Sequence, residues 1–135
     1  MVVLDEAFDL YLPGDDGQVV SGYDAIQLRP ASVSLDYELE LGQDGDLSGT
    51  AEVAFYMAES SDVLWDDASK LGEAREIDLS QRSQTLSGTL LLNAAQIDAL
   101  VSGEFVVGAR ISGQGEGSAI VSYEFKKLIL NVAFF

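Results

Sequence analysis

Two aspartates separated by a single residue have a spacing that suggests chemistry. Asp44 and Asp46 flank Gly45 on a bend between two strand-like segments. Both carboxylates could meet one ion there, and an all-oxygen ligand set suits a hard cation such as Ca2+. An EF-hand loop starting at Asp44 would need a bidentate Glu at its twelfth position, where Phe55 stands. Two interpretations remain: a calcium site, or the favoured one, a tight turn that uses the backbone freedom of Asp and Gly.

The chain lacks the residues that most enzymes use for acid–base and nucleophilic chemistry. It contains no histidine and no cysteine, so the usual general base and the commonest transition-metal ligand are missing together. A pair of carboxylates could hydrolyse a glycosidic bond, but among 23 acidic residues some pair reaches the required spacing in any fold. We therefore expect no enzymatic activity and no cofactor beyond the calcium ion considered above. A small carboxylate-pair glycoside hydrolase is kept only as a third function.

Trp65 is the candidate ligand-contacting residue, and it is the only tryptophan in the chain. It lies in an irregular acidic segment, residues 59–74, where it could stack on a sugar ring together with a tyrosine. The other interpretation is that Trp65 plugs the end of the fold. Sugar stacking would make the chain a carbohydrate-binding module in which a structural calcium ion fixes a loop.

The charge of the chain restricts its partners. Twenty-three acidic and seven basic residues among 135 give a net charge of −16 at pH 7. Nucleic acid and anionic membrane surfaces are recognised by clustered Lys and Arg, so a nucleic-acid partner is excluded. No stretch reaches the ~18 apolar residues of a membrane helix, and the first residues do not resemble a secretory signal. We therefore expect no membrane span.

Alternation of apolar and polar residues predicts β-strands along most of the chain. The pattern is strictest over residues 33–41 and continues over residues 47–57, and the short glycine-containing connection predicts a hairpin. A phase change across Lys126 and Lys127 predicts a β-bulge or a strand that switches sheets. Residues 112–118, rich in glycine, are expected to form a loop. Further strands are expected at residues 4–12, 25–28, 77–79, 86–92, 105–111 and 121–134.

A single short helix is expected near residues 94–101. Asn93 can cap its free amides, Gln96 can complete a capping box, and Gly103 ends it. Seven to nine strands with this one crossover helix predict an all-β fold. We expect one antiparallel β-sandwich domain over residues 1–135, immunoglobulin-like or jelly-roll-like.

The last strand is unusually apolar and ends in NVAFF. In a monomer it should be central or well covered, because a bare apolar edge strand promotes association. If this C-terminal strand is instead an edge, a homo-oligomer is expected.

Four segments resemble small β-sandwich domains of bacterial secreted lipoproteins and surface proteins: ASVSLDYELEL, AEVAFYMAESSDVLW, LLLNAAQIDALVSGEFVVGARISG and YEFKKLILNVAF. The resemblance is one of layout and covers about residues 25–134. Residues 92–111 are also similar to part of a CHRD domain, although this chain has no histidine for the histidine-containing strand of that family. The resemblance implies a non-enzymatic module outside the cytoplasm.

The leading functional hypothesis is therefore a non-catalytic structural or interaction module in the periplasm, at the cell surface or secreted. Its partner would be a protein or a glycan, contacted by loops at one end or by an edge strand that extends a sheet. The carbohydrate-binding module is the alternative.

Overall fold

The chain folds as the all-β domain that its alternating pattern predicts. The computed structural model describes residues 2–21 and 28–134. Within these ranges seven antiparallel strands form one sheet, with one α-helix and two 3-10 turns in the connections. The strands are β1 (Val2–Leu12), β2 (Gln18–Ser21), β3 (Ser32–Gly45), β4 (Ser48–Ala58), β5 (Lys70–Asp78), β6 (Ser83–Leu91) and β7 (Glu104–Ala133). The helical elements are η1 (Ser61–Val63), η2 (Asp67–Ser69) and α1 (Ala94–Ser102).

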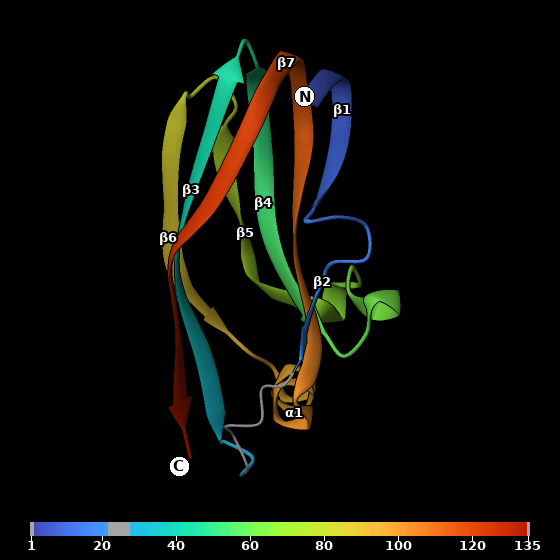
Figure 1. Cartoon of the computed structure of the whole chain (residues 1–135), viewed down its shortest axis with the longest axis vertical. Coiled ribbons are helices and arrows are strands. Elements are labelled where there is room, and N and C mark those ends of the chain that lie inside the picture. The colour runs from blue at the N-terminus through green and yellow to red at the C-terminus, as the bar shows by residue number, and fades with distance from the viewer. Residues whose placement is uncertain (1, 22–27, 135) are drawn as a thin grey trace.

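Strand β7 organises the sheet because it is 30 residues long. Its first half pairs with β4 along one edge and with β2 and β1 along the other. From Ala119 onward it pairs with β3, which also pairs with β6. Figure 1 shows β7 lying beside β4 and β1 and then crossing over to β3. Strand β7 thus folds the single sheet, of order β5-β4-β7-β3-β6, into a nearly closed, barrel-like form whose two facing sides are the layers of the sandwich.

The predicted hairpin between residues 33–41 and 47–57 is wrong. Consecutive strands β3 and β4 are not paired with each other; each pairs with β7. Gly45 at the end of β3 lies opposite Ala119, and Ser48 at the start of β4 lies opposite Glu116. The connection is a corner between the two layers. Period-2 alternation identifies the buried face of a strand but not the strand beside it.

The predicted loop at residues 112–118 is also wrong, because these residues lie inside β7. Over this stretch β1 and β4 flank β7 on both sides. A Cβ atom on Gly113 would overlap the carbonyl of Thr50, and one on Gly117 would overlap the carbonyl of Asp46. The glycines therefore allow close approach of neighbouring strands and do not form a loop.

Two other features of the last strand are confirmed. The register between β3 and β7 shifts where Glu38 faces Lys127 and Leu39 faces Phe125, so Lys126 is the extra residue of a β-bulge. The strand also serves both layers, but it crosses near Ala119 and not at the bulge. The short strand predicted at residues 25–28 falls mainly outside the described residues.

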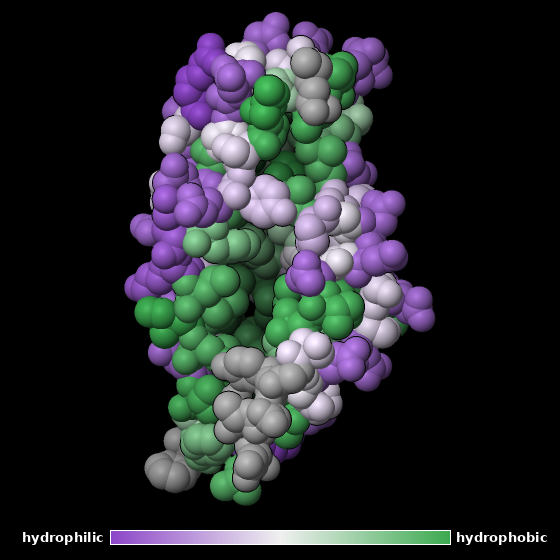
Figure 2. Space-filling view, in the orientation of Figure 1, coloured by the Kyte–Doolittle hydropathy of each residue, from purple (hydrophilic) through white to green (hydrophobic). Residues whose placement is uncertain are grey.

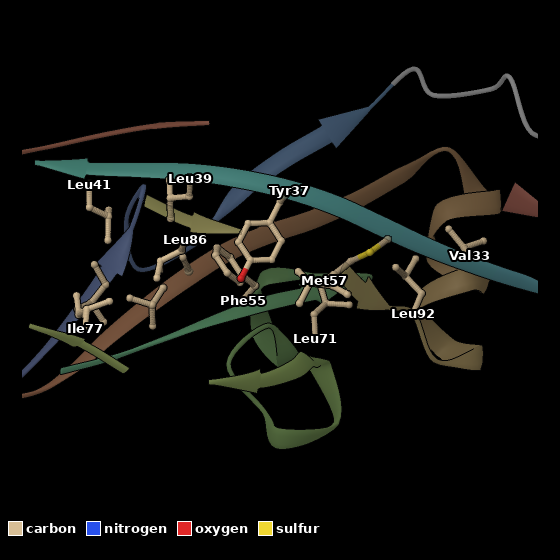
Figure 3. Close-up of a cluster of buried hydrophobic side chains, with 14 of the residues drawn as sticks. Val33, Tyr37, Leu39, Leu41, Phe55, Met57, Leu71, Ile77, Leu86 and Leu92 are labelled. Atoms are coloured by element: carbon tan, nitrogen blue, oxygen red, sulfur yellow. The ribbon is translucent and has the colours of Figure 1, made fainter. Parts of the chain in front are cut away.

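The core fills the space between the layers (Figure 3). Alternate residues of β3, including Tyr37 and Leu39, face alternate residues of β4, including Phe55 and Met57. The rings of Tyr37 and Phe55 approach from opposite layers, with centroids 4.8 Å apart. This packing explains why the strictest alternation in the sequence falls on β3, whose other face is polar.

Helix α1 begins and ends where the sequence predicts. The Asn93 side chain accepts a hydrogen bond from the amide of Gln96, and the Gln96 side chain accepts one from the amide of Asn93. Gly103 ends the helix with φ of 87°, in the left-handed region that glycine adopts readily. No helix among the described residues is long and apolar enough to cross a membrane.

Candidate functional site

The C-terminal half of β7 forms a free edge, defined here as residues 120–133. Among the described residues, β3 is the only strand paired with this segment. Leu128 is 56% exposed and Ile129 is 45% exposed, although the two neighbours face opposite sides of the sheet. Phe134, just beyond the strand, is also exposed. The apolar last strand is therefore an edge in the described structure and not a covered central strand.

A cleft opens between the free edge and strands β1 and β2. The side chains of Tyr123, Phe125 and Leu128 point toward the interior and line this cleft, yet they are 40–56% exposed. They are exposed because no described strand pairs with β7 there on the side away from β3. Figure 2 shows a hollow bordered by hydrophobic residues on this face of the molecule.

The apolar cleft has a volume of about 550 Å³ and reaches into the core. Described residues of both layers line it, and none of these is charged. The polar side chains among these described residues are the amide of Gln18 and the hydroxyls of three tyrosines. The lining residues are Leu12, Pro13, Gln18, Val20, Leu35, Tyr37, Leu39, Phe55, Tyr56, Met57, Leu71, Leu90, Leu92, Leu100, Phe105, Val107, Gly108, Ala109, Tyr123, Phe125, Leu128 and Leu130.

Asp44 and Asp46 lie at the corner between β3 and β4. One carboxylate oxygen of Asp46 accepts a hydrogen bond from the Ser118 amide at 2.8 Å, and the Asp46 amide donates to the Ser118 carbonyl at 3.0 Å. Asp44 is exposed, and its carboxylate lies 4.0 Å from the guanidinium of Arg82. No group of three or more Asp or Glu side chains suited to a metal ion gathers among the described residues. The contacts of Asp46 are those of a corner, and the calcium hypothesis stays a prediction.

Trp65 lies on the outer side of the β4–β7 layer. Its indole nitrogen donates to the Asp15 carbonyl at 2.7 Å. The rings of Tyr11 and Tyr56 meet it edge-on, with centroids 4.7 and 5.2 Å away. The indole also packs so close to β7 that a Cβ on Gly108 would come within 2.6 Å of it. These contacts hold the indole against the protein, where it covers a small second cluster of buried apolar residues.

The charged groups with displaced pKa values are engaged at the surface. The Asp9 carboxylate beside Arg110 raises the pKa of that guanidinium, and Glu124 raises the pKa of Lys126. The Lys126 ammonium lies 2.9 Å from Glu124 and 3.9 Å from Glu40. The Arg110–Asp9 and Lys126–Glu40 pairs connect β7 to β1 and to β3, whereas Glu124 and Lys126 lie on the same strand.

Sequence reasoning missed the cleft, although one signal pointed to its location. The phase change at Lys126 and Lys127 places Tyr123, Phe125 and Leu128 on one side of β7. Residues of this kind predict a buried face. Their exposure depends on where β1 and β2 end in space, which no local pattern encodes.

Comparisons with known proteins identify no relative: no family model, curated sequence or solved structure matches this chain.

Proposed function

We propose that the chain is a non-catalytic interaction module that acts outside the cytoplasm and pairs with a second copy of itself along the free edge of β7. The observation that supports this most directly is the one-sided pairing of residues 120–133. A strand edge with unpaired backbone groups accepts another strand, because each amide and carbonyl gains a partner.

The free edge differs in charge from the edges formed by β1 and β5. Residues 128–134, LILNVAF, contain no charged side chain. Strand β1 carries Asp5, Glu6 and Asp9, and β5 carries charged residues along most of its length. Charged side chains on an edge strand discourage pairing with another chain. Residues 128–134 are thus a part of the sheet edge where two chains of net charge −16 can approach with little local repulsion.

A second copy is the partner that this segment fits best. Two identical edges related by a two-fold axis pair antiparallel, so each copy offers the other the same surface. Leu128 and Ile129 would then be covered on opposite faces of the extended sheet. Because the rest of the chain is acidic, this association should strengthen as salt screens the repulsion.

Single cysteines test this pairing cleanly, because the natural chain has none. Asn131→Cys at the centre of the uncharged segment and Ala133→Cys near its end each place a thiol on the outward face. Directly opposed residues in antiparallel strands have Cβ atoms about 4.5–5.5 Å apart, close to the geometry of a disulfide. Mild oxidation should give a covalent dimer from one or both variants. The control is Val19→Cys on β2, also exposed, and equal cross-linking of this variant would contradict the proposed pairing.

The extracytoplasmic location is proposed on sequence layout and acidity. Its support is the resemblance of residues 25–134 to domains of bacterial secreted lipoproteins and surface proteins. Fractionation of the native cells followed by immunodetection tests it. Recovery in the periplasmic, envelope or secreted fraction is expected, and recovery in the cytosolic fraction would contradict it.

A further inference from the structure

We infer that the apolar cleft is a binding site for a neutral, flexible apolar small molecule, such as a long-chain alcohol. This inference does not rest on the proposed self-association, because the cleft is formed by inward-facing side chains and the association uses the backbone edge.

The size of the cleft is that of a ligand site and not of a packing defect. Its volume of about 550 Å³ lies within the range of roughly 300–1,000 Å³ found for small-molecule pockets. Protein interiors otherwise leave few voids larger than a water molecule. A hollow of this size between two well-packed layers therefore has room for a molecule of a dozen or more heavy atoms.

The lining selects for a molecule that is apolar and uncharged. None of the described residues that line the cleft carries a charge, so an ion entering it would lose its hydration without gaining a counter-charge from them. The net charge of −16 further repels an anionic head group at the entrance. A neutral polar group could instead meet the amide of Gln18 or the hydroxyl of Tyr123, both of which border the cleft.

The entrance lies between two sets of strands that the described structure leaves apart. Leu12, Pro13 and Gln18 border it from β1, β2 and their connection, and Phe125 and Leu128 border it from β7. In Figure 2 the hollow is bordered on both sides by hydrophobic surface. An apolar molecule in the cleft would remove the inward-facing side chains of β7 from water, which is the driving force for its binding.

A fluorescent neutral probe, N-phenyl-1-naphthylamine, tests this site directly. The measurement is made at low salt and low protein concentration, where the chain should be monomeric. We expect saturable fluorescence enhancement and displacement of the probe by 1-dodecanol at concentrations at least tenfold below those needed for dodecanoate. Absence of saturable probe binding, or equal displacement by dodecanoate, would overturn the inference.

Two neighbouring substitutions locate the bound probe. Leu128→Glu places a charge on the cleft side of β7, and Ile129→Glu places the same charge on the opposite face of the same strand. Leu128→Glu should weaken probe binding at least tenfold, whereas Ile129→Glu should change it less than about twofold. Circular dichroism and thermal unfolding establish that both variants fold. Equal effects of the two substitutions would place the probe elsewhere and overturn the inference.

The same pair of variants separates this inference from the proposed self-association. Ile129→Glu should weaken the dimer while it leaves probe binding intact, so either proposal can fail alone. A strand of the second copy could also occupy the cleft. In that case probe affinity would fall as the chain associates at high salt, and this result would overturn a small-molecule site.

Discussion

Asp46 and Ser118 join the corner after β3 to the middle of β7 through two hydrogen bonds, one from each amide. The Ser118 amide donates to the Asp46 carboxylate at 2.8 Å, and the Asp46 amide donates to the Ser118 carbonyl at 3.0 Å. The contact lies next to the point where β7 leaves one layer for the other. Asp44 and Gly45 are the last residues of β3 and are still paired with β7, so Asp46 is the residue that holds the corner against β7.

The first prediction concerns the glycine beneath this corner. Gly117 has φ of 107°, and a Cβ there would overlap the Asp46 carbonyl. Gly117→Ala should therefore lower the free energy of unfolding by about 2 kcal/mol or more, since both backbone strain and a steric clash oppose it. Urea unfolding followed by circular dichroism measures this. Gly14→Ala is the matched control, because nothing lies within 4 Å of a Cβ at Gly14, and its effect should stay within about 1 kcal/mol.

The second prediction concerns calcium at Asp44 and Asp46. The Asp46 carboxylate already accepts the Ser118 amide, and no further acidic side chain joins the pair among the described residues. We therefore expect 1 mM calcium to raise Tm no more than sodium at matched ionic strength, because both ions only screen the acidic surface. A rise of several degrees beyond the sodium control would show selective binding. Asp46→Ala should then abolish that difference.

The third prediction concerns acid stability. The Thr89 hydroxyl and the Asn131 amide donate to Asp36 at 2.6 and 3.0 Å, and these bonds, Thr89 first, lower the pKa of Asp36. A carboxyl with a lowered folded-state pKa stabilises the fold above its unfolded pKa of about 3.9. That contribution is lost as pH falls through the folded value.

Asp36→Asn should accordingly be less stable than the wild type at pH 7, and the gap should narrow as pH falls below about 4. Asp44→Asn, on the same strand, removes an equal charge and controls for the general relief of repulsion. Thermal unfolding between pH 2.5 and pH 7 measures both variants. A gap between the wild type and Asp36→Asn that stays constant over this range would refute the assigned role of Asp36.

The fourth prediction concerns the buried side-chain amide of Gln96, in the first turn of helix α1. Gln96 is 2% exposed, and its side-chain nitrogen donates to the carbonyls of Met57 and Ser69 at 3.2 and 2.9 Å. Gln96→Ala leaves these carbonyls and the helix start without partners, which should cost about 1–3 kcal/mol of unfolding free energy. The exposed Gln81→Ala should change stability by less than about 0.5 kcal/mol. If Gln96→Ala and Gln81→Ala changed the free energy of unfolding in urea equally, the contacts of Gln96 would contribute little to stability.

Features that depend on neighbouring residues could be predicted from the sequence. Asn93 and Gln96 predicted the helix start, and the phase change at Lys126 predicted the bulge, because both are governed by backbone geometry over a few residues. Alternation along β3 predicted its buried face for the same reason.

Features set by distant pairing could not be predicted. The hairpin after β3 and the loop at residues 112–118 were wrong because β7 inserts between strands that are consecutive in sequence. A glycine-rich stretch that lets β1 and β4 approach β7 closely looks the same in the sequence as a glycine-rich loop. The apolar cleft exists because β1 and β2 pair with one half of β7 and leave the other half free. The paired residues of β1 and β7 are about a hundred positions apart in the sequence, so no local pattern predicts this arrangement.

Sedimentation equilibrium of the wild-type chain at low and high salt tests the central proposal most directly. We predict a reversible monomer–dimer equilibrium that strengthens between 20 mM and 500 mM NaCl. Ile129→Lys should abolish the dimer. This outcome would be specific, because the added lysine makes the net charge less negative than −16 and should otherwise favour association by lowering the repulsion between chains. Val3→Lys, at a residue that is 71% exposed on β1, should leave the dimer intact. A monomer at every salt and protein concentration, or a dimer that survives Ile129→Lys, would contradict pairing through the free edge of β7.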